Sequence, residues 1–329
     1  MHHLLYHANC ADGFAAVTLA RAALLQRGIA LADIHTQAVN YGWPQQLPGG
    51  LTSGDTITYL DYTPPQEVID CVVSLKTVPL TLIDHHSTAA PRHNQEPGTQ
   101  NQEPLGFTSV FDLTHSGAAL TWLHFFPGQP LPRAVELIEW RDLGHAFHPE
   151  NAGTETTTAA LNLHACLFRA RAREFNGWEL ALFAPAESLA VYELAIGARL
   201  REGDRLLIQS AAQTPHWLDF SQSPRLPASL SGPSLSRIPA VNGLGAELIS
   251  DACNALLAAH PAAPFTASWY VDPKTGSLTY SLRSRPANHP GHVNVAQIAA
   301  ALAPGGGGHP CAAGFSTTHP ILFSAAPHP

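Results

Sequence analysis

Residues 78–86, Val-Pro-Leu-Thr-Leu-Ile-Asp-His-His, run from an apolar segment directly into one carboxylate and two imidazoles. Residues 78–83 predict a buried strand, so Asp84, His85 and His86 stand at its carboxyl end. In open α/β sheets, ligands bind outside that end of the strands. Because Asp and His side chains bind divalent transition metals, the stretch predicts a metal-binding edge of a sheet. The chain holds 19 histidines in 329 residues, so some adjacent pairs arise by chance, and the neighbouring segments matter.

Strand and helix patterns alternate on both sides of this stretch. Strands are predicted at residues 4–6, 56–60 and 78–83, and helices at 14–27, 66–75, 116–126 and 132–140. This alternation predicts a parallel sheet with helices on both faces, which places the chain in the α/β class. The polar residues 92–106 contain a near-duplicate Asn-Gln-Glu-Pro and are expected to form an exposed insertion.

The second half of the chain predicts a smaller domain. Residues 184–213 are helical in pattern and could connect two domains, and the Ser- and Pro-rich residues 214–233 resemble a linker. Further strands are expected at 238–242, 265–271 and 277–283, with a hairpin turn at 272–276 and helices at 245–259 and 293–302. We therefore expect a parallel-sheet catalytic domain at 1–183, a connecting helix and linker at 184–233, and a smaller α/β substrate-binding domain at 234–329.

Composition narrows the classes of partner. The formal net charge is −8, which argues against binding of long nucleic acid by charge alone. The five cysteines are scattered without a CxxC spacing, so neither a zinc knuckle nor a disulfide framework is indicated. No apolar run reaches the roughly 18 residues that a membrane helix needs, and the first residues lack a signal-peptide pattern. We expect a cytoplasmic protein without membrane contact.

Ligand-type side chains stand at four junctions between predicted elements. They are His7 and Asp12 after the first strand, Asp61 after the second, residues 84–86 after the third, and Asp142 after a helix. Carboxylates mixed with imidazoles suit manganese, magnesium, iron or zinc. Several converging carboxylates would repel one another unless cations lie between them.

Each junction also has a simpler explanation when taken alone. Asp12 precedes a glycine and could serve a turn or a helix N-cap. Asp142 is adjacent to Arg141 and could form a surface pair with it. Four such coincidences in one βαβ pattern are much less probable than one, and this favours a common metal site.

The ordered set of residues resembles the DHH phosphoesterase superfamily, which includes RecJ-type nucleases, nanoRNases (oligoribonucleases), cyclic-dinucleotide phosphodiesterases and manganese pyrophosphatases. Near the C-terminus, Gly306-Gly307-Gly308-His309 is similar to the signature of the DHH-associated substrate domain, and residues 312–315, Ala-Ala-Gly-Phe, also fit. The resemblance covers most of the chain. It implies a phosphodiesterase that uses two Mn²⁺ ions, or Mg²⁺ or another divalent metal, to activate water against short oligonucleotides or linear or cyclic dinucleotides.

The resemblance also implies roles for individual residues. Asp61 would bridge both metals, His85 would bind metal directly, and Asp84 and His86 would orient the ligands and contact phosphate during catalysis. The implied metal ligands are His7, Asp12, Asp61, His85 and Asp142, with Asn9 as a further candidate.

The first motif departs from the family pattern His-x-Asp-x-Asp-Gly. Residues 7–13 read His-Ala-Asn-Cys-Ala-Asp-Gly, so one extra residue separates His7 from Asp12 and one carboxylate is missing. Asn9 could bind metal through its amide oxygen, or Cys10 through a thiolate. The sequence leaves both open.

Substrate binding is expected in the second domain. Arg283 could hold a phosphate through two parallel hydrogen bonds, Gly306, Gly307 and Gly308 could offer backbone N–H groups to an anion, and His309 could donate to the phosphate. Arg285 is a rival for Arg283, because strand alternation would place both on one face.

Two other functions remain open. A pyrophosphatase or exopolyphosphatase would cleave a phosphoanhydride, but it would need more cations than the 17 lysines and arginines of this chain suggest. A degenerate metal- or nucleotide-binding module without catalysis is motivated by the missing carboxylate. In each case the expected partner is a nucleotide or another small phosphate compound, and a homodimer stays open.

Overall fold

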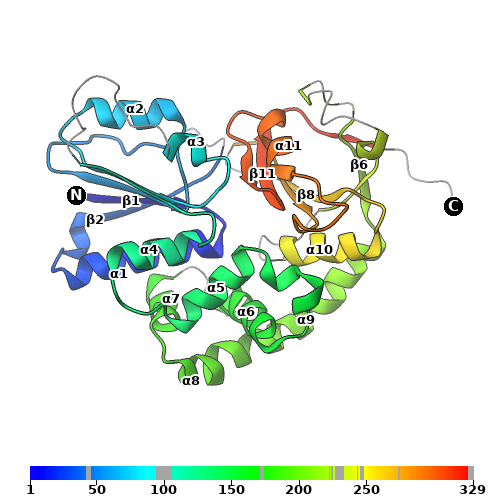
Figure 1. Cartoon of the computed structure of the whole chain (residues 1–329), viewed down its shortest axis with the longest axis horizontal. Helices are drawn as coiled ribbons and strands as arrows, with labels where there is room; N and C mark the ends of the chain where they lie inside the picture. The colour runs from blue at the N-terminus through cyan, green and yellow to red at the C-terminus, as the bar shows by residue number, and fades with distance from the viewer. Residues whose placement is uncertain are drawn as a thin grey trace. The chain divides into compact units, whose positions relative to one another are not determined.

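The computed structural model describes residues 1–41, 46–93, 106–170, 174–221, 223, 225–226, 233–242, 244, 248–272 and 275–324. The chain forms two compact units, Met1–Leu200 and Arg201–Pro329, which are described separately below (Figure 1). The domain limits expected at residues 183 and 234 stay a prediction. Four expected features fall wholly or partly outside the described residues: the insertion (94–105), part of the linker (227–232), the start of one helix (245–247) and the hairpin tip (273–274).

The first unit is built on a five-stranded parallel sheet of order β2-β1-β3-β4-β5. Its strands are β1 (His2–His7), β2 (Ile34–Val39), β3 (Thr56–Leu60), β4 (Leu80–Asp84) and β5 (Phe107–Phe111). The inner strands β3 (Thr-Ile-Thr-Tyr-Leu) and β4 (Leu-Thr-Leu-Ile-Asp) are almost wholly buried, because helices cover both faces of the sheet. The expected α/β class is therefore confirmed.

Helices cover both faces of this sheet, as Figure 1 shows with α1 and α4 on one face and α2 on the other. One apolar core joins α1, α4, α5 and α7, and a second joins α2 to the opposite face of the strands. The helices are α1 (Ala11–Gln26), α2 (Gln66–Ser74), α3 (Ala90–His93), α4 (Gly117–Phe125), α5 (Arg133–Asp142), α6 (Glu155–Ala165), α7 (Phe175–Leu182) and α8 (Ala186–Leu189). Short 3-10 helices span Leu31–Asp33, His145–Phe147 and Pro149–Asn151.

The long helical stretch expected at 184–213 is present with one irregularity. After α8, a π-helical segment, Ala190–Leu194, leads into α9 (Ala195–Gln213), and a second π segment, Cys166–Ala170, follows α6. Among the described residues, every helix is too short or too polar to cross a bilayer.

Gly197 of α9 lies directly against α6, and we expect Gly197→Ala to destabilise the first unit by about 1–3 kcal/mol. A Cβ at this position would lie 1.7 Å from the backbone oxygen of Asn162, so one helix would have to move. Gly203→Ala in the same helix is the matched control, because a Cβ there meets nothing within 4 Å and should stabilise the helix by about 1 kcal/mol. Urea unfolding of both variants measures the two effects. Equal stabilities would contradict the close packing of α9 against α6.

The second unit holds a seven-stranded sheet of order β10-β11-β9-β8-β7-β6-β12, in which only β7 and β8 pair in parallel. Its strands are β6 (His216–Asp219), β7 (Ile238–Asn242), β8 (Phe265–Val271), β9 (Leu278–Ser284), β10 (Gly307–His309), β11 (Ala312–Thr317) and β12 (Leu322–Phe323). The second unit, expected to be a smaller α/β domain, is thus built on a mixed sheet whose strands are mostly antiparallel.

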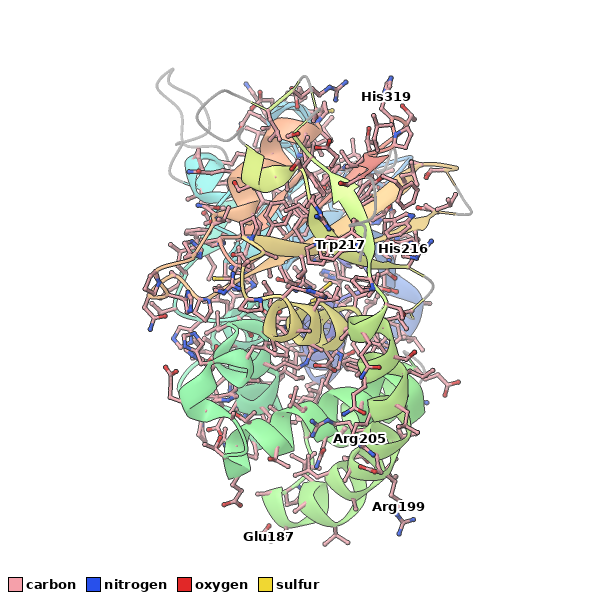
Figure 2. The ribbon with its side chains drawn as sticks, turned by 90° about the vertical axis from the view of Figure 1, so that its right-hand side faces the viewer. Glu187, Arg199, Arg205, His216, Trp217 and His319 are labelled. Carbon is pink, nitrogen blue, oxygen red and sulfur yellow. The ribbon has the colours of Figure 1, made fainter. Side chains whose placement is uncertain are left out.

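Besides residues 201–213 of α9, the described residues of the second unit form two further helices and a short 3-10 turn. The elements are α10 (Ile249–Ala259), α11 (Val295–Leu302) and the 3-10 helix Pro233–Leu235. Ile238 and Ala240 of β7 belong to the core that holds α11, whereas Val241 packs with α10. The helices therefore cover opposite faces of the sheet. On β6, Trp217 (labelled in Figure 2) lies 4.9 Å from the guanidinium of Arg237.

Candidate metal centre

Three neighbouring strands of the first unit deliver the predicted side chains to one edge of the sheet. β1 ends on His7, Asp61 directly follows β3, and β4 ends on Asp84. Because these strands are adjacent and parallel, their carboxyl ends meet. Asp61 adopts a left-handed backbone with φ 55°, and its N–H donates to the backbone oxygen of Ile83 at 2.8 Å. The backbone thus turns at Asp61 as soon as β3 ends.

Helix ends supply the other two carboxylates. Asp12 lies in the first turn of α1, and its Oδ1 accepts a hydrogen bond from the backbone N–H of Ala118 in α4, at 3.0 Å. Asp142 is the last residue of α5 instead of following it, because that helix runs two residues further than expected. Gly117 is needed at the start of α4, since a Cβ there would lie 2.5 Å from Asp61 Cβ and 2.9 Å from Asp12 Oδ2.

Asp61 stands between two groups of metal donors. The first donor group is His7, Cys10 and Asp61, and each contributes one ligand atom within 4.8 Å of the others. Asp61 Oδ2 lies 3.4 Å from His7 Nδ1, whereas Asp61 Oδ1 lies 3.1 Å from His85 Nε2. The two oxygens of this single carboxylate therefore face different sides of the centre.

The second donor group is Asp12, His85 and Asp142, whose ligand atoms also lie within 4.8 Å of one another. His85 Nε2 lies 3.6 Å from Asp12 Oδ2 and 3.4 Å from Asp142 Oδ2. His85 Nε2 thus lies close to three carboxylates, which come from α1, from α5 and from the end of β3. We call the two donor groups together the metal centre.

Two of the three carboxylates of the metal centre are fully buried, and the third, Asp142, is half-buried. Asp12 and Asp61 are each 1% exposed. Burial raises the pKa of Asp12 well above its usual value, and Asp61 and Asp142 raise it further. Burial opposes ionisation of Asp61 too, but His7 and His85 outweigh it and hold the Asp61 pKa well below its usual range.

This arrangement fits divalent cations. Among the described residues, none donates a hydrogen bond to Asp12 Oδ2, a buried carboxylate oxygen. Burying an anionic oxygen without a partner costs free energy, and a metal ion would supply the missing partner. The mixture of imidazole nitrogen and carboxylate oxygen suits Mn²⁺, Fe²⁺ or Zn²⁺. The donor set and its burial are those of a metal site.

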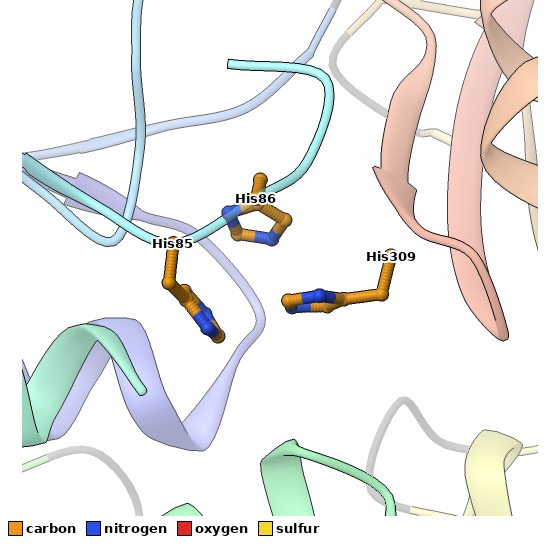
Figure 3. A group of neighbouring side chains, drawn as sticks. All are labelled: His85, His86 and His309. Carbon is orange, nitrogen blue, oxygen red and sulfur yellow. The ribbon is translucent and has the colours of Figure 1, made fainter. Parts of the chain in front are cut away.

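Asp84 supports its neighbours through both oxygens. Its Oδ1 accepts hydrogen bonds from the backbone N–H groups of His85 and His86 and from His86 Nδ1, the last at 2.7 Å. Its Oδ2 accepts from Thr63 Oγ1 at 2.6 Å. Burial alone would raise the pKa of Asp84, but the adjacent His86 holds it below its usual value. Burial alone would lower the pKa of His86, but Asp84 raises it to about 9. Asp84 therefore orients His86, whose ring lies beside that of His85 (Figure 3).

A hydrogen-bonded chain extends outward from Asp84. Because Thr63 Oγ1 donates to Asp84, its oxygen must accept from His93 Nε2, 2.7 Å away. His93 Nδ1 then accepts from Ser109 Oγ at 2.7 Å. This directionality requires a neutral His93, and burial lowers the His93 pKa. Thr63 and His93 are not predicted from the sequence, although Thr63 stands two residues after Asp61.

Two tyrosines also line the metal centre and were not expected from the sequence. The ring of Tyr41 lies 5.5 Å from that of His7 and 6.0 Å from that of His86, and Tyr62 lies 5.0 Å from Tyr41. Tyr62 follows Asp61 directly, which could have drawn attention to it. Asn9, in contrast, is exposed and left-handed with φ 59°, and its role as a metal ligand stays a prediction.

In the second unit, the two candidate arginines differ in what they contact. Arg285 lies beyond the end of β9 and donates to the backbone oxygens of Ala263 (2.5 Å) and Pro261 (2.6 Å). Arg283 donates to Ser250 Oγ in the first turn of α10 at 2.8 Å. Arg283 also donates to a backbone oxygen, that of Leu282 at 2.9 Å. Both guanidinium groups are therefore held by protein groups, and phosphate binding by Arg283 stays a prediction.

The glycines before His309 have a packing role. A Cβ at Gly306 would lie 2.1 Å from the backbone oxygen of Ala299, and Gly308 has φ 136° with its Cβ position 2.6 Å from the Ala312 oxygen. These glycines let β10, which includes Gly307, approach α11 and β11 closely. β10 ends on His309 (Figure 3). Anion binding by Gly306, Gly307, Gly308 and His309 stays a prediction.

Comparison with known proteins gives distant likenesses. No family model matches the chain. An uncharacterized protein of Acanthamoeba polyphaga mimivirus is 24% identical over 324 residues, which is 95% of this chain and 66% of that protein. This chain thus spans just under two thirds of that relative.

Two solved structures align along most of the chain. The pGpG-specific phosphodiesterase PggH of Vibrio cholerae is 14% identical, with 96% of this chain and 93% of that chain covered and a TM-score of 0.43. RecJ of Thermus thermophilus in complex with Mn²⁺ is 16% identical, with 96% and 49% covered and a TM-score of 0.48. At this level of likeness, neither activity is transferred to this chain.

Proposed function

We propose that this protein is a metal-dependent phosphodiesterase of the DHH phosphoesterase superfamily, acting on short oligonucleotides or on linear or cyclic dinucleotides. The position of Asp61 between the two donor groups carries the proposal, since one oxygen faces His7 and the other faces His85. That is the position of a carboxylate able to hold two cations at once. The convergence of four sequence segments on one sheet edge supports the same conclusion.

The side chains of the metal centre would hold two divalent ions, Mn²⁺ or Mg²⁺. The five residues of the metal centre proposed as ligands here are His7, Asp12, Asp61, His85 and Asp142. Ions bound there would neutralise the phosphate and make a water molecule reactive at neutral pH. The buried position of Asp12 and Asp61 excludes bulk water, which strengthens the hold of the carboxylates on a cation.

Asp84 and His86 would act on the substrate side of the metal centre. The hydrogen bond from His86 Nδ1 to Asp84 fixes the orientation of the ring, so Nε2 is the nitrogen that would contact a phosphate oxygen. Thr63 and the backbone N–H groups hold Asp84 in turn. This scaffold would keep the imidazole in one orientation during the in-line attack of water on phosphorus.

A panel of substrates tests the proposed reaction. The purified protein with added Mn²⁺ is offered a linear dinucleotide of the pApA type, a cyclic dinucleotide, pyrophosphate and 3′-phosphoadenosine 5′-phosphate. We expect release of nucleoside monophosphate from a dinucleotide. Cleavage of pyrophosphate alone would replace the proposal with phosphoanhydride hydrolysis. Bound metal without turnover of any substrate would identify a binding module.

We expect Arg283→Ala to raise the KM for a dinucleotide by roughly 10–100-fold while leaving the metal content unchanged, because a bidentate phosphate contact contributes about 1.5–3 kcal/mol. Arg285→Ala is the matched comparison. Loss of its bonds to the Ala263 and Pro261 oxygens should lower the unfolding midpoint instead. Steady-state kinetics and thermal unfolding separate the two variants, and an unchanged KM in Arg283→Ala would remove Arg283 from the substrate site.

A further inference from the structure

When the first motif is counted back from Asp12 and Gly13, Cys10 occupies the place where the resembled motif has a carboxylate. It is the N-cap residue of α1, with an extended backbone (φ −117°, ψ 141°), and its side chain makes no capping hydrogen bond. Instead, Cys10 Sγ lies within 4.8 Å of the ligand atoms of His7 and Asp61. It also donates to Asp142 Oδ1 at 4.0 Å. The thiol therefore belongs to the metal centre and not to the helix cap.

A second observation marks this side of the centre as a ligand position. Asp61 Oδ2 is buried and, among the described residues, accepts no hydrogen bond. Its contact is with His7 Nδ1 at 3.4 Å. An imidazole nitrogen, a thiol sulfur and a buried carboxylate oxygen thus surround one point. Asn9, the other residue able to replace the missing carboxylate, is exposed.

We propose that Cys10 binds metal as a thiolate and, with His7 and Asp61, forms a nitrogen–sulfur–oxygen position that prefers Zn²⁺ over Mn²⁺. The second donor group offers nitrogen and oxygen only, so the centre holds two chemically different positions. When the metal binds, the S–H bond breaks and its proton goes to solvent. The electron pair of that bond stays on sulfur and is donated to the metal. This inference rests on the proposed function, because it assigns a ligand within the same metal centre.

Two physical effects favour the thiolate. Thiolate ligands select zinc and other soft or borderline metals, whereas carboxylate and water ligands suit manganese and magnesium. The N-terminus of a helix stabilises a negative charge through its free N–H groups. Cys10 has this position at the start of the 16-residue α1. Burial and the carboxylates of Asp61, Asp142 and Asp12 instead raise the pKa of the Cys10 thiol well above its usual value, so the thiolate forms only with a cation bound beside it.

Titration of the metal-free protein with Co²⁺ tests the ligand directly. We expect an intense near-ultraviolet band from thiolate-to-cobalt charge transfer in the wild-type protein, and its loss in Cys10→Ser. Cys71→Ser is the matched control, because Cys71 is exposed on α2, and it should retain the band. A band that persists in Cys10→Ser, or Co²⁺ binding to the wild type without a band, would overturn the proposal. Circular dichroism confirms that the variants are folded.

Metal competition tests the preference. In Cys10→Asp, which restores a carboxylate, we expect the ratio of Zn²⁺ to Mn²⁺ affinity to fall by at least about 10-fold. An unchanged ratio would contradict the assigned preference. The Co²⁺ titration and the substrate panel test the two proposals separately. A charge-transfer band without hydrolysis of any substrate refutes the phosphodiesterase. Mn²⁺-dependent hydrolysis without a band refutes the thiolate ligand. A protein that binds no metal refutes both.

Discussion

Asp61→Asn will remove most of the bound metal and lower the rate of phosphodiester hydrolysis by more than about a thousandfold, or roughly 4 kcal/mol in the activation barrier. Asp61 is the only carboxylate of the described residues whose oxygens face both His7 and His85. The amide keeps the shape but loses the charge that would hold the two proposed cations. Asparagine also tolerates the left-handed backbone at this position (φ 55°), so the fold should persist.

Elemental analysis and the dinucleotide assay measure this effect. Asp70→Asn is the matched control, since Asp70 is exposed on α2 and contacts Gln66 only within its own helix. That variant should keep its metal and its activity. His85→Ala should behave like Asp61→Asn, because His85 Nε2 contacts three carboxylates. Full metal content and turnover in either variant would refute the mechanism.

Gly117→Ala will lower metal affinity and hydrolysis by roughly 100-fold or more without changing any ligand. The added Cβ would lie 2.5 Å from Asp61 Cβ, 2.8 Å from Asp61 Oδ1 and 2.9 Å from Asp12 Oδ2. Because the added Cβ cannot lie this close to Asp61 and Asp12, the two carboxylates must move away from the start of α4. A displacement of about 1 Å at a catalytic group can cost about two orders of magnitude in rate.

Gly203→Ala serves as the control for the substitution, because its Cβ meets nothing within 4 Å. Metal affinity from calorimetric titration and the rate with saturating Mn²⁺ should both be unchanged in this control. In Gly117→Ala, overpacking should also reduce stability by about 1–3 kcal/mol, which unfolding in urea measures. Wild-type metal affinity in Gly117→Ala would show that the carboxylates do not depend on the start of α4.

Some of the metal centre could be predicted because parallel strands obey a simple rule. β3 and β4 are buried on both faces, so their sequences are mostly apolar, with threonine at three positions. Asp61 follows β3 directly, and Asp84 is the last residue of β4. The carboxyl ends of neighbouring parallel strands lie at one edge of the sheet. Their grouping therefore followed from the order of the residues alone.

The edge strands could not be predicted in the same way. β2 reads Ile-His-Thr-Gln-Ala-Val and β5 reads Phe-Thr-Ser-Val-Phe, with polar residues in both. An edge strand pairs on one side only and is less buried, so its sequence need not form an apolar run. The sheet was consequently expected with fewer strands than it has.

The alternation of apolar runs and helical patterns was enough to establish the α/β class and the residues that meet at the strand ends, because both depend on periodicity. The surroundings of Asn9 and Cys10, and of Arg283 and Arg285, depend on the tertiary structure, and their roles at the site stay predictions. A left-handed torsion of 59° leaves Asn9 exposed, and the end of β9 at Ser284 lets Arg285 reach backbone carbonyls beyond α10. Side-chain direction at such positions depends on single torsions and on distant contacts, and residue spacing does not encode either.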